Sequence, residues 1–373
     1  MPLQAPVPAR RHRFVPLTVT DVEPLTDAAV AVTFALPDED DVAAPFLAFE
    51  PGQHLTLRAD IDGVQVRRSY SLCLSRSRAL ATRTVRVASA LVAGGRMSAW
   101  LNGSVRPGDT IEVLPPLGTF TSTLRPGTAR HHVFVAAGSG ITPVLSLLTT
   151  ALEEEPDATV TLFFGNRTTR DVMFLEELQD LKDAHLERVQ IVNVLSREPT
   201  DVELLHGRID AERLPRLLAV FAPLETVDDF FLCGPDGMVQ EARAYLSSAG
   251  VDPARVHHEV FHVPSQDEPP RRVVVDTSAP PQAVITVNLD GRTSRVEMPT
   301  RAESILEATL RVRPDAPFSC TGGVCGTCRA RVTAGEVRMD RNYALEPDEL
   351  AAGIVLACQS HPVTDEVTLD YDA

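Results

Sequence analysis

Three cysteines lie within nine residues near the carboxyl end of the chain, in the stretch "CTGGVCGTC" at 320–328. A fourth cysteine follows, and the spacing of the set is C-x4-C-x2-C-x29-C. The four residues are Cys320, Cys325, Cys328 and Cys358. This spacing is typical of the ligands of a plant-type [2Fe–2S] cluster. Four thiolates can converge on two irons only where the backbone curls tightly, and the glycines of the loop permit that curl.

A structural zinc site is the alternative interpretation of these cysteines. Zinc sites usually show two C-x2-C pairs, whereas this sequence has one, so the iron–sulfur interpretation is favoured. Two further cysteines, Cys73 and Cys233, lie in distant segments and are not expected to be ligands. Because a cluster of this kind moves single electrons and does no bond chemistry, another part of the chain must supply them.

The stretch "RSYS" at 68–71 has side chains that suit a flat cofactor bearing phosphates. An arginine can pair with a pyrophosphate, and an aromatic ring two residues later on a strand points to the same side and can cover a flat ring. A serine can reach a ring nitrogen. A second stretch, "GGRMS" at 94–98, opens an expected helix whose free amides suit a phosphate. Taken singly, each stretch is also compatible with ordinary surface and core residues or a plain helix start, but their order after "PGQHL" is far more specific.

The stretch "AAGSGITP" at 136–143 indicates a strand that turns into a helix. It is not a complete G-x-G-x-x-G fingerprint, because Pro143 stands where the third glycine would be. Even so, Gly138 and Gly140 let the backbone approach a ligand, and a proline suits the first turn of a helix whose N-terminus attracts pyrophosphate.

Two other strand ends carry candidate residues. The stretch "LCGPDGM" places Cys233 at the end of a strand, where ligands of open α/β sheets bind; a small buried thiol is the alternative. Arg167 and Arg170 follow another strand and could pair with a 2′-phosphate, or they are simply solvent-exposed arginines. The first interpretation favours NADPH over NADH.

The periodicity of the rest of the chain predicts three domains that position these motifs. Residues 12–125 read as short alternating strands separated by turns, which favours an antiparallel β-barrel or sandwich. Residues 126–263 alternate strands with helices, as in a doubly wound parallel α/β sheet. Residues 264–281, rich in proline and charge, are expected to be a linker with at most a short strand in "RRVVVD". Residues 282–373 predict a small α+β module around the cysteine loop.

The composition limits the classes of protein to which the chain can belong. Its 44% hydrophobic and 23% charged residues are typical of a soluble globular protein, and no run of eighteen apolar residues is present to span a bilayer. A formal net charge of −16 argues against a nucleic-acid partner, because phosphate backbones are held by basic surfaces. The arginine-rich start is not followed by an apolar stretch, so no secretory signal is expected and a cytoplasmic location follows as the default.

These motifs, in this order, resemble the ferredoxin–NADP reductase superfamily, and the cysteine module resembles a plant-type ferredoxin of the β-grasp fold. The resemblance implies an FAD-binding barrel, a nicotinamide-binding sheet and a [2Fe–2S] domain. The FAD residues that it implies are Arg68, Ser69, Tyr70, Ser71, Arg96, Met97, Ser98 and, beside the flavin, Phe261. The nicotinamide residues that it implies are Gly138, Gly140 and Thr142, with Cys233 near the site of hydride transfer. Gly234, beside Cys233, and Arg167 are further candidates for binding the nicotinamide cofactor, and Ser71 is a second candidate catalytic residue.

Further stretches, among them "FFGNRTT" and "NYALEPDELAAGIVLACQS", resemble the reductase subunits of phenylacetyl-CoA 1,2-epoxidase complexes over essentially the full length. That resemblance implies a partner, the oxygenase component of a multicomponent di-iron monooxygenase in phenylacetate degradation. The similarly arranged reductase of 3-ketosteroid 9α-hydroxylase is the nearest alternative. A Rieske oxygenase as acceptor, or a non-redox binding protein with a zinc-stapled tail, is also left open.

The order of the segments suggests an electron path. Nicotinamide gives two electrons at once and a cluster accepts one, so a flavin must stand between them, and the hypothesis is NADPH to FAD to [2Fe–2S] to oxygenase. The chain also contains two Glu-x-x-His motifs, at 203–206 and 259–262. Neither is expected to form a di-iron site, because Gly207 interrupts the first and "HEVFHV" alternates like a strand. Oxygen activation is therefore expected in another polypeptide.

Overall fold

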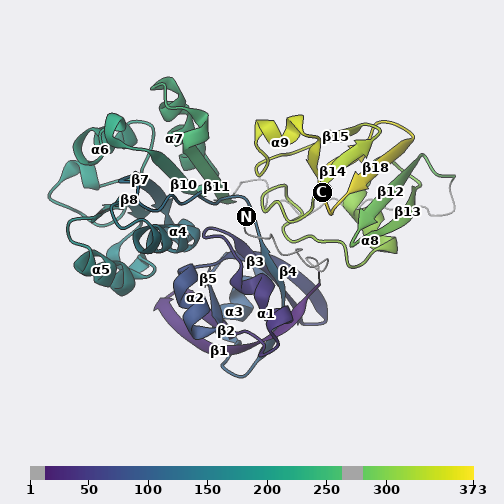
Figure 1. Ribbon diagram of the computed structural model, residues 1–373, viewed down its shortest axis with the longest axis horizontal. Coiled ribbons are helices and arrows are strands. Elements are labelled where there is room, and N and C mark those ends of the chain that lie inside the picture. Colours follow the sequence, from purple (N-terminus) through teal and green to yellow (C-terminus); the bar gives the residue numbers. More distant parts are fainter. Residues whose placement is uncertain (1–12, 263–279) are drawn as a thin grey trace.

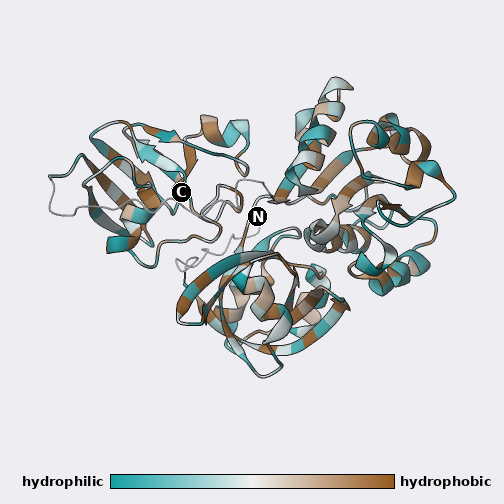
Figure 2. Ribbon diagram, turned by 180° about the vertical axis from the view of Figure 1, so that it is seen from behind, coloured by the Kyte–Doolittle hydropathy of each residue, from teal (hydrophilic) through white to brown (hydrophobic). Residues whose placement is uncertain are grey.

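A computed structural model of the protein describes residues 13–262 and 280–373, which form three lobes that meet near the middle of the molecule (Figure 1). The linker predicted for 264–281, with its possible strand "RRVVVD", lies almost entirely outside the described residues. Hydrophobic residues concentrate along the strands inside each lobe, and hydrophilic residues follow the outer helices and turns (Figure 2). Within the described ranges, no helix is both long enough and apolar enough to cross a lipid bilayer.

The first domain is an antiparallel sheet of six strands in the order β4-β3-β6-β1-β2-β5, which confirms the predicted barrel. An isolated bridge from Leu72 to Val87 lies beside the end strands β4 and β5 and brings the two edges of the sheet together. The strands are β1 (Val15–Thr26), β2 (Ala29–Ala35), β3 (His54–Ile61), β4 (Val64–Ser71), β5 (Thr84–Ala90) and β6 (Thr110–Leu117). The helices are α1 (Asp40–Leu47), α2 (Arg76–Thr82) and α3 (Arg96–Gly103).

The second domain is a parallel sheet of five strands in the order β11-β10-β7-β8-β9, as predicted. The order reverses between β7 and β10, so the carboxyl ends of these two neighbours form the crevice where open α/β sheets bind ligands. The strands are β7 (His131–Ala137), β8 (Thr159–Asn166), β9 (Val189–Leu195), β10 (Asp229–Pro235) and β11 (Val256–His262). The main helices are α4 (Ile141–Glu154), α5 (Leu175–Ala184), α6 (Arg213–Phe221) and α7 (Asp236–Ser248).

One helix of this domain begins later than its sequence pattern predicts. The periodicity of "DVMFLEELQDLKD" predicts a helix from Asp171, but α5 begins at Leu175. Phe174 adopts a left-handed backbone conformation with φ of 59°, which a continuous α-helix does not allow. Val172, Met173 and Phe174 are all buried, so packing of this turn into the core outweighs the local helical preference.

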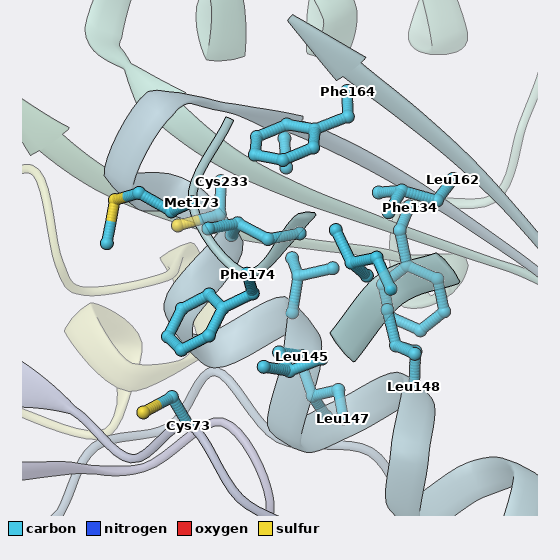
Figure 3. Packing of buried hydrophobic residues seen from close by; sticks show 14 of the residues in the cluster. Cys73, Phe134, Leu145, Leu147, Leu148, Leu162, Phe164, Met173, Phe174 and Cys233 are labelled. Atoms are coloured by element: carbon cyan, nitrogen blue, oxygen red, sulfur yellow. The ribbon is translucent and has the colours of Figure 1, made fainter. Parts of the chain in front are cut away.

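The barrel and the parallel sheet share one buried hydrophobic cluster. Cys73 of the barrel and Phe174 of the second domain lie close to each other within it, and Cys233 lies in the same cluster (Figure 3). Ala29 and Ala31 of β2 also belong to it, so β2 is buried on both faces. The shared core fixes the two domains against each other and brings the ends of β4, β7 and β10 together.

The third domain is a mixed five-stranded sheet in the order β13-β12-β18-β14-β16, with a two-stranded ribbon of β15 and β17. This is the predicted α+β module: a first hairpin, a helix that Ser304 and Glu307 begin with a capping box, and a final strand. The strands are β12 (Ala283–Leu289), β13 (Arg292–Met298), β14 (Arg329–Ala334), β15 (Val337–Met339), β16 (Ile354–Leu356), β17 (Ser360–Pro362) and β18 (Glu366–Asp370). The helices are α8 (Ile305–Val312) and α9 (Pro347–Ala351).

Candidate functional site

The three thiols of the cysteine loop between α8 and β14 and the thiol of Cys358, which follows β16, come together as two pairs. Cys320 interacts with Cys325, and Cys328 interacts with Cys358. No group of three or more His, Cys, Asp or Glu in the described ranges surrounds one point as the ligands of a single metal ion do. Two pairs are the arrangement that two irons require, because each iron of a [2Fe–2S] cluster takes two thiolates.

The backbone of the loop is shaped to receive such a cluster. Gly323 and Gly326 have φ of +79° and +67°, and a Cβ at Gly323 would lie 3.1 Å from the carbonyl oxygen of Arg341. The amides of Gly322 and Cys325 donate to the Cys320 sulfur at 3.4 and 3.3 Å. The Cys325 thiol and these amides lower the pKa of Cys320 to about 5, which favours the thiolate that binds iron. The residues present therefore fit the cluster, with one cysteine pair for each iron.

Strand β4 carries the "RSYS" residues at the edge of the barrel. Arg68 is exposed, and its guanidinium donates to the carbonyl of Arg67 at 2.8 Å. Tyr70 packs at the margin of the barrel core, and burial raises its pKa to about 12, so its hydroxyl stays neutral. An exposed cation and a neutral ring on the same side of the strand are what the predicted flavin contacts require.

The three residues predicted at the pyrophosphate open helix α3. The Met97 side chain packs in the barrel core, and the Ser98 hydroxyl donates to the Gly95 carbonyl at 3.0 Å while accepting from the amide of Val92. Only Arg96 has an exposed side chain. A phosphate at this helix end would thus be bound by backbone amides and Arg96, and the proposed contacts of Met97 and Ser98 would be through their amides.

The glycine turn after β7 lies against the end of β10. A Cβ at Gly140 would lie 2.2 Å from the carbonyl oxygen of Cys233, so only glycine allows the two segments to approach this closely. Gly138 has φ of +52°. The hydroxyl of Thr142, which is buried, donates to the carbonyl of Ser139 at 3.0 Å and so shapes the turn. These residues lie where the carboxyl ends of β7 and β10 meet, at the turn for which the sequence predicts nicotinamide binding. Gly234, the residue of β10 after Cys233, has φ of +159°.

A half-buried carboxyl group, that of Glu259, lies between the serine and the cysteine that the sequence predicts to be catalytic. The Ser71 hydroxyl donates to Oε2 of Glu259 at 3.5 Å, and Glu259 also interacts electrostatically with Cys233. Burial raises the pKa of Glu259 to about 8 and raises the pKa of the Cys233 thiol well above its usual range. Both groups are therefore largely protonated at neutral pH. Phe261 is partly buried at the edge of the cluster shared by the two domains.

In the sequence, Glu259 stands out only as part of a Glu-x-x-His motif. The structure confirms that this segment is a strand, β11, rather than a helix. One sequence signal could have identified the residue: a carboxylate stands in the middle of a strand that runs beside the predicted catalytic cysteine. Such a group is costly to bury unless it serves a site.

The cysteine domain docks on both other domains. Val324 of the loop belongs to the same buried cluster as Val239 and Val260 of the parallel-sheet domain. Glu346 of the third domain lies 2.9 Å from Nδ1 of His258. The other side of the loop faces the barrel, where Thr327 Oγ1 lies 3.4 Å from the hydroxyl oxygen of Ser69. The loop thus contacts the same strand that carries the predicted flavin residues.

Two further strand ends of the parallel sheet, those of β8 and β9, are followed by arginines. Arg167 follows β8, is exposed, and forms an ion pair with Asp171. Arg170 is exposed, and Arg197 follows β9, where its amide donates to the carbonyl of Arg167 at 2.8 Å. The sequence does not predict a role for Arg197, because nothing in the pattern alone brings the turns after β8 and β9 together.

Comparisons with known proteins agree with this architecture. Three family descriptions match the chain: "Oxidoreductase FAD-binding domain" at 16–122, "Oxidoreductase NAD-binding domain" at 134–244 and "2Fe-2S iron-sulfur cluster binding domain" at 287–363. Phthalate dioxygenase reductase has the same fold, with a TM-score of 0.57 at 23% identity over 96% of this chain and 98% of that one. A type IV self-sufficient cytochrome P450 monooxygenase gives a TM-score of 0.65 at 23% identity, over 99% of this chain and 42% of that one.

Curated relatives match over nearly the whole length. The chain is 41% identical to a 1,2-phenylacetyl-CoA epoxidase subunit from Escherichia coli (strain K12), over 96% of this chain and 98% of that protein. It is 38% identical to the ferredoxin reductase component of 3-ketosteroid-9-alpha-monooxygenase of Mycobacterium tuberculosis (strain ATCC 25618 / H37Rv), over 95% of each. The chain therefore belongs to the family of oxygenase reductase components that includes these two proteins, and it is an oxidoreductase that joins FAD-binding, NAD-binding and 2Fe-2S domains in one polypeptide.

Proposed function

We propose that this chain is the NADPH-dependent reductase of a phenylacetyl-CoA epoxidase, and that it delivers electrons to the separate di-iron oxygenase component of that complex. The observation that carries the proposal is the contact between the cysteine loop and strand β4, through Thr327 and Ser69, within one polypeptide. The 41% identity to the epoxidase protein over 96% of the chain supports the choice of partner. None of the six cysteines of the chain, all of which lie in the described ranges, forms a disulfide in the structure. Reduced cysteines are typical of the cytoplasm, where we place the protein.

The residues of the chain would divide the work between binding, orientation and proton handling. Arg68, Arg96 and the amides that open α3 would hold the flavin phosphates, and the Gly138 turn would seat the nicotinamide cofactor against β10. When bound, the nicotinamide supplies two electrons together, the flavin can release them singly, and the cluster passes one at a time to the partner. Glu259, with its raised pKa, would hold a proton 3.5 Å from the Ser71 hydroxyl at the meeting point of both sites.

The preference for NADPH would depend on the arginines after β8 and β9. Replacing Arg170 or Arg197 with alanine is expected to raise the KM for NADPH by about tenfold or more, because a hydrogen bond to a charged group contributes about 1.5–3 kcal/mol. The KM for NADH, which lacks the 2′-phosphate, should stay unchanged. Steady-state kinetics with a flavin-level acceptor and both nucleotides measure the effect.

The matched control for this measurement is Arg216→Ala. Arg216 is an exposed arginine of α6 that pairs with Glu203, so its removal changes the net charge equally without touching the strand ends. If the variants of Arg170 and Arg197 show the same ratio of KM for NADPH to KM for NADH as Arg216→Ala, the proposed preference for NADPH is wrong.

Reconstitution tests the proposed partner. The purified reductase is mixed with phenylacetyl-CoA epoxidase oxygenase, and in parallel with 3-ketosteroid 9α-hydroxylase oxygenase, whose reductase component shares 38% identity with this chain. We expect NADPH-dependent product formation with the first. Turnover only with the steroid oxygenase would contradict the proposed partner while leaving the electron path intact.

A further inference from the structure

The side chains of strand β4 divide between two tasks. Successive residues of a strand point to opposite faces, so Arg67, Ser69 and Ser71 face one way and Arg68 and Tyr70 the other. Arg67 and Ser69 both contact the third domain, and Ser71 contacts Glu259 of the second domain. The face that carries Arg68 and Tyr70 is the one that the proposed function gives to the flavin. Strand β4 of the first domain therefore contacts both the second and the third domain.

Arg67 anchors the segment that leads into the cysteine loop. Its guanidinium is 4.1 Å from the ring centroid of Phe318 and donates to the carbonyls of Pro314 and Ala316 at 3.4 and 3.5 Å. The side chain is buried, and burial lowers the pKa of Arg67 to about 10, which still leaves it charged at neutral pH. A buried cation that bonds two carbonyls holds its partner segment firmly.

Thr327 makes the contact closest to the cluster ligands. It lies between Cys325 and Cys328, and its side chain is only 3% exposed. Its Oγ1 is 3.4 Å from Ser69 Oγ and 3.4 Å from Nε2 of His54, and it also interacts with the Cys325 thiol. Burial lowers the pKa of His54 to about 4, so the imidazole is neutral at neutral pH. One hydrogen bond can then form between Nε2 and the Thr327 hydroxyl, with either group as the donor. A single hydroxyl thus connects a cluster ligand to strands β3 and β4.

We propose that Thr327 is a positioning residue for electron transfer from the flavin to the cluster, whose hydroxyl holds the cysteine loop in register with Ser69 and His54. The inference rests on the proposed function and adds the residue that fixes the separation of the two centres. Each transfer moves one electron from the flavin to the cluster, with no bond formed or broken and NADPH as the source. Because tunnelling falls steeply with distance, a loop that shifts on β4 transfers electrons more slowly.

The test compares Thr327→Val with Thr327→Ser in the full-length protein loaded with both centres. Valine keeps the volume and removes the hydroxyl, whereas serine keeps the hydroxyl. Because the electron tunnels between the two centres, a small displacement of the loop changes the rate only moderately, so we expect the valine variant to slow the flavin-to-cluster step several-fold and the serine variant to restore it. Anaerobic stopped-flow mixing with NADPH resolves flavin reduction from cluster reduction in the same trace, and flavin reduction serves as the internal reference.

Two further measurements separate positioning from tuning of the cluster. A spectroelectrochemical titration gives the midpoint potential of the cluster, and hydrogen–deuterium exchange follows the peptides of the cysteine loop and of strands β3 and β4. We expect faster exchange at this interface in Thr327→Val and not in Thr327→Ser. The positioning role would be overturned if the flavin-to-cluster step in Thr327→Val were slower only by the amount that a shifted midpoint potential explains, with unchanged hydrogen–deuterium exchange. A flavin-to-cluster rate equal to that of the native protein would overturn it as well.

A variant on the barrel side keeps the test decisive if Thr327→Val does not take up iron. Ser69→Ala breaks the same contact from β4, far in sequence from the cysteines, and should slow the same step. An unaltered flavin-to-cluster rate in Ser69→Ala would also overturn the proposal. Failure of the native protein to pass electrons from NADPH to its cluster would instead refute the proposed function, and the stopped-flow trace distinguishes the two outcomes.

Discussion

Cys328→Ser is expected to abolish electron delivery to the oxygenase while leaving NADPH-driven reduction of a small flavin-level acceptor intact. Cys328 is one of the four predicted cluster ligands and interacts with Cys358, so its loss leaves one iron with a single thiolate. Changes in the outer shell of a metal site cost about 10- to 100-fold, and removal of a direct ligand should cost at least about 100-fold. Iron and acid-labile sulfide content, the visible spectrum and the two acceptor assays measure the effect.

The matched control is Cys73→Ser, which makes the same chemical change at a buried cysteine of the barrel. Cys73 donates to the carbonyl of Arg86 at 3.4 Å and lies outside the cysteine loop. This variant should therefore retain both its iron content and electron delivery to the oxygenase. Equal loss of flavin-level activity and delivery in Cys328→Ser would contradict a sequential path, because it would mean that the flavin also depends on the cluster.

The sequence carries most of what is local in this fold. The order of barrel, parallel sheet and α+β module follows from hydrophobic periods of two and of 3.6 residues. The capping box of Ser304 and Glu307 is a local feature of the same kind, because its two residues are only three positions apart. The cluster ligands follow from spacing alone, because four thiolates on two irons allow few spacings. Local patterns fail where tertiary packing decides, as at Phe174, whose left-handed turn is stabilised by burial in a core that the segment itself does not encode.

The contacts that join the three domains could not be predicted in the same way. Ser71 and Glu259 are separated by 188 positions, and Ser69 and Thr327 by 258. Alternation on β4 shows that two faces exist but does not say which domain each face meets. The sequence motifs therefore predict Ser71 and Cys233 at one site, but they do not predict that the Glu259 carboxyl lies between these two residues.

The raised pKa of Glu259 has consequences for stability as well as for catalysis. Burial raises its pKa from the usual 4.5 to about 8, so the folded protein keeps a proton that the unfolded chain releases at lower pH. The unfolded state therefore binds fewer protons than the folded state between about pH 4.5 and 8, and the free energy of unfolding falls as the pH rises through this window. Glu259→Gln, which is neutral at every pH, should remove this decline, and denaturant titrations at pH 6 and pH 8.5 measure it.

Glu259→Gln is also expected to slow NADPH-driven turnover by about 100-fold, because general acid–base groups typically contribute 10²- to 10⁴-fold. Glutamine keeps the shape of the carboxyl and its hydrogen bond with Ser71, but it cannot accept or release a proton 3.5 Å from that hydroxyl. Any change of rate near pH 8 in the native enzyme should disappear with it. Glu187→Gln, which makes the same substitution at an exposed position far in sequence from this site, is the control for the exchange of Glu for Gln. A Glu259→Gln enzyme that turns over like the control and still titrates near pH 8 would show that the proton resides on another group, and the Ser71, Glu259 and Cys233 constellation would then serve only to pack β4 against β10 and β11.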